Sequence, residues 1–311
     1  MSRNQQLSES WGKRSATDNT PATGSLAVTL AGLESRTEAA FDDRDSVTVN
    51  GEDQPLERFS GFLDHLRTNL GCPGQGLAIE SANNFPTSAG LASSSSGFAA
   101  LAGAVAALAG RDLPTNELSA LARLGSGSAT RPVFGGFTVF DAGAHSAEPE
   151  QSESFWPEFR VVLAVVREGA KPTSSRAAME ASRTTSPFYD RWVQTSPALL
   201  ADARAALADR DWHRLGPLVR HSYLRMFGTM FSSEPPPIYW QPESLALIQA
   251  VDALRREGFT AWETMDAGPQ VKVFCPADQA EALVAELDRR VPGLRFLTAA
   301  PGPGLRLGRL E

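Results

Sequence analysis

The chain has 311 residues, of which 42% are hydrophobic and 21% charged, so we expect a folded protein long enough for two domains. Its net charge of −7 and pI near 5.3 argue against a broad surface for nucleic acid or acidic membranes, because both need a positive field. The two cysteines, Cys72 and Cys275, lack metal-ligand spacing, and no apolar run approaches the roughly 18 residues of a membrane helix. Met1 to Gln6 lacks a signal-peptide core, so the sequence predicts a cytoplasmic protein.

The first half reads as short strands and three helices. The opening stretch to about Gly24 is polar and predicts a loop or frayed end. From Gln54 to Leu70 the apolar residues recur at steps of three and four, which predicts an amphipathic helix that ends at Gly71. The other predicted elements are strands at 25–30, 46–50, 76–80 and 136–140, helices at 94–109 and 117–124, and a loop at 125–130.

The second half begins with a buried-strand pattern from Phe159 to Val166. We expect helices at 175–181, 189–207 and 212–230, and then the order helix 244–257, strand 261–264, strand 271–274, helix 279–290 and strand 294–297. Helices that alternate with strands in this way predict an α+β unit of ferredoxin-like type. We place the domain boundary near Trp156 and Pro157, which gives domains at 1–157 and 158–311.

The segment from Asn83 to Phe98 is rich in Ser, Ala and Gly and leads directly into a predicted helix. Glycine lets a ligand approach the backbone, and the first N–H groups of a helix attract anions. Serine hydroxyls add hydrogen bonds to phosphate oxygens or ligate Mg²⁺. The segment contains no Gly-Lys-Ser/Thr, so it is not a Walker A loop. It predicts a phosphate-binding loop, although a close-packed helix start has the same composition.

Three shorter segments also carry polar groups suited to chemistry, and each admits a structural reading as well. Gly125 to Arg131 joins a Gly-Ser loop to a guanidinium that suits phosphate or carboxylate, but it also reads as a surface loop. Asp266 lies between a strand and a Gly-Pro turn, where site residues are often delivered and where Asp also caps turns. Trp11 to Arg14 holds a basic pair that binds phosphate or is simply solvated.

Taken together, these segments resemble the mevalonate-diphosphate decarboxylase family of the GHMP-kinase superfamily. The similarity is carried by 83–101, by 125–131 with 135–137, and by Met265 to Pro269, and it extends from about Trp11 to Leu297. The resemblance implies a two-domain α+β GHMP-kinase fold, with an N-terminal domain like ribosomal protein S5 domain 2 and a ferredoxin-like C-terminal domain. It also implies a homodimer.

The resemblance implies a reaction in which ATP phosphorylates the tertiary hydroxyl of mevalonate 5-diphosphate and loss of that phosphate drives decarboxylation to isopentenyl diphosphate. Asp266 would orient or deprotonate the hydroxyl, and Arg131 would hold the substrate carboxylate. ATP and Mg²⁺ would be required, without a protein cage for the metal, and the ion's candidate protein ligand is Ser94. The implied binding residues are Lys13, Ser126, Ser128 and Arg131 for substrate, and Gly90, Ala92, Ser93 and Ser94 for ATP and Mg²⁺.

The N-terminus departs from the family pattern, in which a Lys-Tyr pair precedes Trp-Gly-Lys-Arg. Glu9 and Ser10 stand in those positions here, although Asn4 and Trp11 to Arg14 remain. A carboxylate in place of a catalytic lysine reverses a charge beside an anionic substrate. Another cation compensates, the substrate is different, or catalysis is weak. The alternatives are the same chemistry on mevalonate 5-phosphate, 3-kinase activity without decarboxylation, or a silent paralogue that binds nucleotide or a partner.

Overall fold

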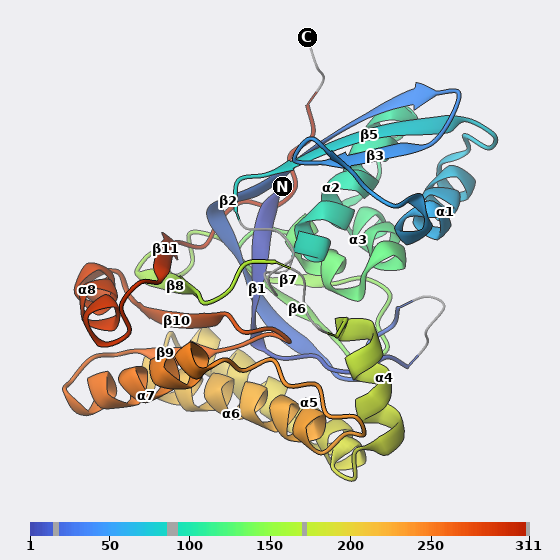
Figure 1. Ribbon diagram of the computed structural model, residues 1–311. Helices are drawn as coiled ribbons and strands as arrows, with labels where there is room; N and C mark the ends of the chain where they lie inside the picture. The colour runs from blue at the N-terminus through green and yellow to red at the C-terminus, as the bar shows by residue number, and fades with distance from the viewer. Residues whose placement is uncertain (15–18, 86–92, 170–172, 309–311) are drawn as a thin grey trace.

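The computed structural model describes residues 1–14, 19–85, 93–169 and 173–308 (Figure 1), and of Ser93 it describes the backbone alone. Its N-terminal part is built on a seven-stranded sheet with the order β4-β3-β5-β2-β6-β7, in which β1 also pairs with β2. The long strand β2 holds this sheet together, because its first half pairs with β1 and β6 and its second half with β5. The strands are β1 Ser2–Ser8, β2 Ser25–Asp42, β3 Ser46–Val49, β4 Glu52–Asp53, β5 Gly76–Asn83, β6 Phe137–Phe140 and β7 Glu148–Gln151.

Three helices pack on this sheet: α1 (Ser60–Leu70), α2 (Ser93–Leu108) and α3 (Thr115–Gly125). The helix α1 presents its apolar stripe to the sheet and ends, as predicted, at Gly71, whose φ of 77° is readily adopted only by glycine. Short 3-10 helices precede α1 at Leu56–Arg58 and follow α3 at Gly127–Val133, which we call η2. Residues 127–130, predicted as loop, therefore start a helical turn that fixes Arg131.

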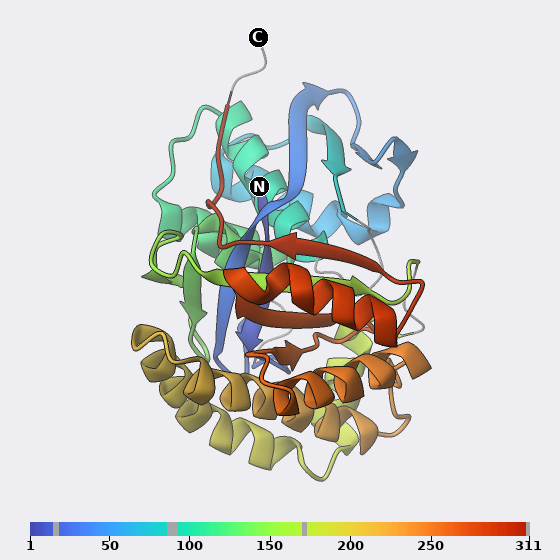
Figure 2. The same cartoon turned by 90° about the vertical axis from the view of Figure 1, so that its left-hand side faces the viewer.

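The C-terminal part contains a four-stranded antiparallel sheet with the order β11-β8-β10-β9. Numbered along the chain, this is the order 4-1-3-2 of a ferredoxin-like unit, so that prediction is confirmed. Four helices connect the first two strands, and α8 connects the last two (Figure 2). The elements are β8 Phe159–Val165, α4 Ser175–Thr185, α5 Tyr189–Ala208, α6 Trp212–Phe231, α7 Pro242–Arg256, β9 Trp262–Thr264, β10 Val271–Pro276, a 3-10 turn Ala277–Gln279, α8 Ala280–Arg290 and β11 Arg295–Ala299.

The two sheets share a hydrophobic core. Alternate residues of β8 point to opposite sides, so Val162 packs among the C-terminal helices while Val161 joins side chains of β1, β2 and β6. Aromatic rings continue this contact, since Phe159 lies 5.3 Å from Phe137 and 5.8 Å from Phe274 between ring centroids. Because one core contains residues from both parts, groups contributed by either part are held in fixed relation. The division at residue 157 stays a prediction.

The last described residues cross back to the N-terminal part (Figure 1). The Gly302 N–H donates to the Thr29 carbonyl at 2.8 Å, and the Leu305 N–H donates to the Val133 carbonyl at 3.1 Å. A Cβ on Gly103 would lie 2.6 Å from the end of the Leu305 side chain, so this segment passes close to α2 at a glycine. The returning segment therefore packs α2 and η2 against the rest of the molecule.

The sequence predictions place most helices and strands within a few residues of their positions. The strand predicted at 25–30 was too short, because β2 continues to Asp42, and the short strands β4 and β7 were not predicted. Residues 2–8, predicted as part of a loop or frayed end, form the buried strand β1. The prediction was wrong because this strand is polar, with Arg3, Asn4 and Gln5 all at most 2% exposed. Buried polar strands carry no apolar alternation. Arg3 belongs to the charged cluster described next, and Asn4 and Gln5 form hydrogen bonds with its members.

Candidate active site

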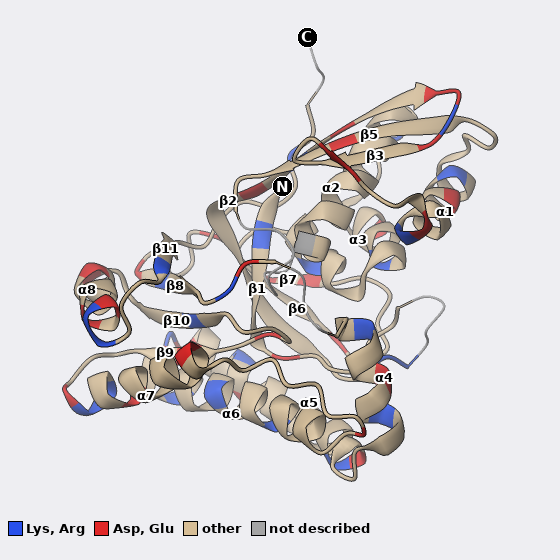
Figure 3. Ribbon diagram, viewed as in Figure 1, with Lys and Arg blue, Asp and Glu red and all other residues tan. Residues whose placement is uncertain are grey.

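Five charged side chains gather where β1, η2 and the β9–β10 hairpin meet. Figure 3 shows positively charged segments on β1 and β10 in the interior of the fold. All but one are at most 2% exposed, whereas the Asp266 side chain is 14% exposed. We call this group the charged cluster; its members are Arg3, Glu9, Arg131, Asp266 and Lys272. Burying so many charges is costly unless they balance one another or a ligand, so the cluster is a candidate site.

Asp266 lies in the turn that joins β9 to β10. Lys272 pairs in register with Thr264 across this hairpin, which brings the lysine back to the aspartate. The Lys272 Nζ donates to Asp266 Oδ2 at 2.8 Å, and Gln5 Nε2 donates to Oδ1 at 3.2 Å. The carboxylate is thus held in place from both domains while part of it still meets solvent, as a group that contacts a substrate requires.

Arg131 reaches the same place from η2. Its Nε donates to Asn4 Oδ1 at 3.1 Å and its Nη1 donates to Ser25 Oγ at 2.8 Å. Burial lowers the pKa of Arg131 to about 10, and the charges of Glu9 and Asp266 oppose that shift. The structure therefore brings Arg131 and Asp266, distant in sequence, within electrostatic range of each other.

Glu9 follows β1 and is fully enclosed by the cluster. The Thr264 hydroxyl donates to Glu9 Oε1 at 3.4 Å, while Oε2 has no hydrogen-bond partner among the described residues. Burial raises the pKa of Glu9 well above its ordinary value; Asp266 adds to this effect, whereas Lys272 and Arg131 oppose it. The carboxyl keeps its proton to higher pH than an exposed glutamate, which weakens the charge reversal expected from the sequence.

Lys272 is a site residue that the sequence reasoning missed. Burial lowers its pKa, and the neighbouring Asp266 carboxylate opposes that effect. The available signal was its position in β10, where a lone lysine stands in the apolar run of residues 271–275. A lysine in a doubly buried strand needs a counter-charge, and that requirement points to a site. Lys272 places a buried positive charge beside Asp266, so it is a candidate for the compensating cation that the replacement at Glu9 called for.

Lys13, predicted to bind substrate, lies beside a second cation. It donates to the Asn19 side chain, whose amide donates in turn to the Leu124 carbonyl at 2.9 Å at the end of α3. Burial and the charge of Arg176 lower the pKa of Lys13 to about 8. Arg176 was missed, although Ser174 caps α4 just before it and Ser-Ser-Arg at a helix start is an anion-binding pattern. Two neighbouring cations form a candidate anion site.

Ser126, which links α3 to η2, and Ser128, in the first turn of η2, were also predicted to bind substrate. Their hydroxyl oxygens are 3.1 Å apart, and Ser95 Oγ donates to the Ser128 carbonyl at 2.8 Å. A Cβ on Gly127 would lie 3.0 Å from the Asn19 carbonyl, so this turn packs closely on the segment that holds Lys13. The predicted substrate residues Lys13, Ser126 and Ser128 are therefore linked through Asn19 and Gly127.

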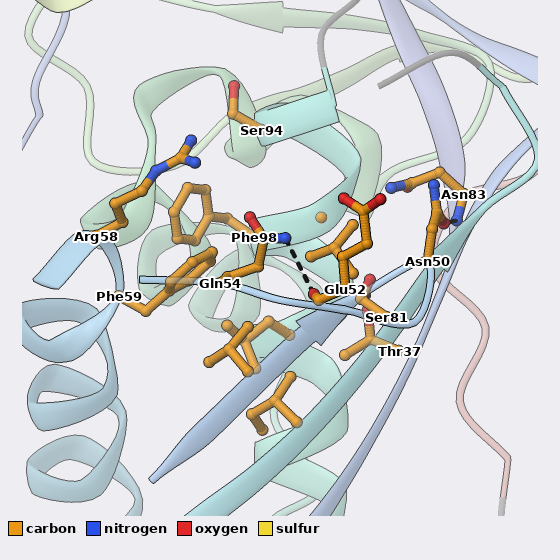
Figure 4. Close-up of a pocket in the computed structure, with 15 residues that line it drawn as sticks. Thr37, Asn50, Glu52, Gln54, Arg58, Phe59, Ser81, Asn83, Ser94 and Phe98 are labelled. Atoms are coloured by element: carbon orange, nitrogen blue, oxygen red, sulfur yellow. Dashed lines mark hydrogen bonds between the residues drawn. The ribbon is translucent and has the colours of Figure 1, made fainter. Parts of the chain in front are cut away.

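The predicted phosphate segment leads into α2, which begins at Ser93 as expected. Gly90 and Ala92 lie outside the described residues, as does the side chain of Ser93. Ser94 and Gly97 line a cavity of about 350 Å³ between α2 and the sheet (Figure 4). The helix start therefore borders a cavity, which is the geometry that an anion at its first N–H groups requires.

Neutral polar groups and aromatic rings dominate this cavity. Figure 4 shows the Asn50 and Asn83 amides on one side and the Phe59 and Phe98 rings on the other, with Gln54 between them. Amides can pair with the ring nitrogens of a base, and aromatic rings can stack on it. The residues present therefore fit the nucleoside part of ATP. In the described part of the chain, no three His, Cys, Asp or Glu side chains could together hold a metal ion, and no helix could span a membrane.

The two-domain α+β fold, with a buried charged cluster and a cavity at the start of α2, is that of the GHMP-kinase class of small-molecule enzymes. Residues 2–155 match the diphosphomevalonate decarboxylase-like N-terminal domain, and residues 161–299 match the mevalonate 5-diphosphate decarboxylase C-terminal domain. Diphosphomevalonate decarboxylase of Gibberella zeae is 33% identical over 312 residues, which cover 91% of this chain and 82% of that protein. The chain belongs to the diphosphomevalonate decarboxylase family.

Solved structures agree with the family assignment over the whole fold. The mevalonate diphosphate decarboxylase from Enterococcus faecalis superposes with a TM-score of 0.90 at 34% identity, covering 97% of this chain and 95% of that one. A structure of MDDEF in complex with MVAPP, AMPPCP and magnesium gives a TM-score of 0.92 at 35% identity with the same coverage. The resemblance seen in the sequence motifs and the two-domain α+β fold are confirmed.

Proposed function

We propose that the chain carries out ATP-dependent decarboxylation of mevalonate 5-diphosphate to isopentenyl diphosphate. The observation that carries this function is Asp266, a partly exposed carboxylate held between Lys272 and Gln5 in the charged cluster of this family's fold. A general base must lie where a substrate can reach it and must be fixed in orientation, and Asp266 meets both conditions. The proposal includes a homodimer, which the resemblance implies, and a cytoplasmic location, which the sequence predicts.

Asp266 takes the proton of the tertiary hydroxyl as that oxygen attacks the terminal phosphorus of ATP. The bond between this phosphorus and the ADP oxygen breaks, and a new P–O bond forms on the substrate. The C–O bond to the new phosphate then breaks, and the electrons of the bond to the carboxylate form the alkene and release CO₂. Arg131 holds the carboxylate during the first step, with its guanidinium oriented by Asn4 and Ser25.

Lys13 and Arg176 bind the substrate diphosphate, together with Ser126 and Ser128. Burial, together with repulsion by the neighbouring Arg176, lowers the pKa of Lys13 to about 8 in the free protein. A diphosphate relieves this repulsion more fully than a monophosphate, because it brings more negative charge. The cation pair therefore favours mevalonate 5-diphosphate over the monophosphate.

ATP lies with its base in the cavity at α2 and its phosphates at the start of that helix. Asn50, Gln54, Phe59 and Phe98 surround the base, and the predicted residues Gly90, Ala92, Ser93 and Ser94 contact the phosphates. Mg²⁺ accompanies ATP, with Ser94 as its candidate protein ligand. When bound, the ion neutralises phosphate charge during transfer.

A silent paralogue is disfavoured by the replacement of one cation by another. Glu9 stands where the family pattern has a lysine. Lys272 nevertheless supplies a buried positive charge 2.8 Å from the Asp266 carboxylate. The raised pKa of Glu9 further limits the negative charge at its position. The cluster thus retains the charge balance that the family reaction needs.

The test is an assay of the purified chain with ATP, Mg²⁺ and each mevalonate phosphate, following CO₂ and ADP together. CO₂ release with mevalonate 5-diphosphate supports the proposal, and Asp266→Asn is the matched inactive control. Release with the monophosphate alone would reassign the substrate. ADP without CO₂ would indicate a 3-kinase, and neither product would indicate a silent nucleotide-binding protein. Light scattering of the same sample checks the homodimer.

A further inference from the structure

Arg3 is a buried guanidinium that makes no hydrogen bond to the described residues. The residue is 0% exposed, and none of its Nε, Nη1 and Nη2 atoms has a partner there. Its pKa falls to about 10 through burial. A guanidinium carries five N–H donors and cannot readily lose its charge, so enclosing it without acceptors is strongly unfavourable. Such a group is usually retained for a ligand rather than for stability.

The surroundings of Arg3 place it between the two predicted subsites. On one side are Asp266 and Lys272. The Asp266 carboxylate raises the pKa of Arg3, and the charge of Arg3 lowers the pKa of Lys272. On the other side its guanidinium carbon lies 5.7 Å from the ring centroid of Phe85, at the edge of the range for a cation–π contact. Phe85 belongs to the segment predicted to hold the ATP phosphates. Arg3 therefore lies between that segment and the proposed general base.

The charge of the cluster also calls for an anion. Arg3, Arg131 and Lys272 are positive, and they face only two carboxyl groups, one of which, Glu9, keeps its proton to raised pH. Arg131 is already oriented by Asn4 and Ser25 and is assigned to the substrate carboxylate. The donors of Arg3 are the uncommitted ones, and their fork matches two oxygens of a phosphoryl group.

We propose that Arg3 binds the oxygens of the phosphoryl group as that group moves from ATP to the substrate hydroxyl beside Asp266. This inference rests on the proposed function and adds a residue that the family motifs do not contain. Phosphoryl transfer depends on neutralising charge on the moving group, and a well-placed arginine accelerates such reactions by about 10³-fold or more. Arg3 supplies that charge from β1, within the same chain.

The experiment compares Arg3→Gln and Arg3→Lys with the unaltered protein. Arg3→Gln is expected to lower kcat by about 10³-fold, with the KM values for ATP and substrate within a few-fold of their original values, because the contact strengthens in the transition state. Arg3→Lys recovers part of kcat because it keeps the charge. Removing an unpaired buried charge also raises the thermal midpoint of the ligand-free protein.

The matched control is Arg67→Gln, because Arg67 is a mostly buried arginine whose donors are all paired, with Asp45, Asp64 and the Gln75 carbonyl. This variant is expected to lower the thermal midpoint and leave kcat unchanged. If Arg3→Gln instead behaves like Arg67→Gln, losing stability but not turnover, Arg3 is structural and the proposal is wrong. If Arg3→Gln does not fold, kcat of Arg3→Lys is the test. An unchanged kcat would mean that Arg3 has only a structural role, whereas a lowered kcat supports the proposal.

Direct anion binding separates this inference from the overall reaction. In the presence of saturating MgADP, inorganic phosphate is titrated by calorimetry into the unaltered protein and into Arg3→Gln. We expect at least a tenfold weaker dissociation constant for phosphate in the variant, and this readout does not require CO₂ release. Equal phosphate affinities would overturn the proposal. A loss of affinity for acetate but not for phosphate would assign Arg3 to a carboxylate and would overturn it as well.

Discussion

The cavity at α2 and the charged cluster differ in the kind of side chain that each one buries. The cavity is lined mainly by neutral amides, hydroxyls, aliphatic side chains and rings, with Glu52 and Arg58 as charged residues at its wall, and its lining residues belong to the N-terminal domain. The cluster consists of buried charges from both domains, contributed by β1 and the residue that follows it, by η2, by the turn between β9 and β10, and by β10. Neutral groups tolerate burial without a ligand, whereas buried charges depend on one another.

This difference predicts how each region responds to substitution. A change in the cavity acts on the fit of one ligand and leaves the rest of the molecule intact. A change in the cluster alters the balance of every charge near it, so rate, pH dependence and stability move together. Binding of the nucleotide is thereby separated from the chemistry, and variants of the two regions test that separation.

Asp266→Asn should give the largest effect. The amide keeps the shape of the side chain but cannot accept the substrate proton, so kcat should fall by about 10²–10⁴. Substrate and ATP affinities should change far less, and the thermal midpoint should drop modestly because Lys272 loses its ion-pair partner. Steady-state kinetics and thermal unfolding check this. A folded variant with unchanged turnover would leave Asp266 as a turn residue, since Asn caps turns equally well.

Lys272→Met should be next. Without the cation 2.8 Å from its carboxylate, the cluster loses charge stabilisation at the reacting atoms, and kcat should fall by about 10². The sharper measurement is rescue: Glu9→Lys, which restores the lysine of the family pattern, should recover much of kcat in the double variant. Glu9→Lys alone should remain active. A double variant as slow as Lys272→Met would mean that the two positions do not substitute for each other.

The positions of these residues in the chain explain why one part of the site was predicted from the sequence and the other was not. Asp266, Arg131 and the start of α2 were predicted because each stands in a contiguous motif with turn or helix-start residues. Lys272 and Arg3 stand in strands, and only tertiary pairing brings them to Asp266. Asp266 is distant in sequence from Arg3, and it lies six residues before Lys272 across the β9–β10 turn. Neither Arg3 nor Lys272 stands in a contiguous motif, so burial of a lone charge was their only signal.

The same reasoning explains the fold. The amphipathic helices and apolar strands were predicted because their periodicity is local, as in α1 with its end at Gly71. The strand β1 was mistaken for a loop because its side chains serve the cluster rather than a hydrophobic core. Sequence-based prediction therefore failed at the segment whose residues carry the proposed chemistry.

Gly97→Leu should affect the cavity alone. A Cβ at Gly97 meets nothing within 4 Å, and the residue lines the cavity from α2, so a leucine occupies space meant for the nucleotide. The KM for ATP should rise more than tenfold with kcat nearly unchanged. Replacing a helical glycine should also stabilise α2 by about 0.5–1 kcal/mol. Gly228→Leu in α6, with equally open space, is the matched control that should leave the KM for ATP unaltered. A large fall in kcat for Gly97→Leu would break the separation between cavity and cluster.

Lys13 should give the smallest effect and a characteristic pH dependence. Its pKa of about 8 means that the charged form, which binds the diphosphate, declines as pH rises through 8. Between pH 7 and 9 the protonated fraction falls about tenfold, so substrate KM should rise by up to that factor while the KM for ATP stays constant. In Lys13→Met the substrate KM should be higher at pH 7 and should change less between pH 7 and 9.

The stability of the free protein should move in the opposite direction. Because folding lowers the pKa of Lys13 from 10.5 to about 8, the unfolded chain binds more protons between these two values. The free energy of unfolding therefore gains with rising pH through this window, and Lys13→Met should lose that gain. Urea titrations at pH 7.5 and 9.5 on both proteins measure the difference. A substrate KM that is equally pH-dependent in both proteins would assign the titration to another group, and Lys13 would then have no part in gripping the diphosphate.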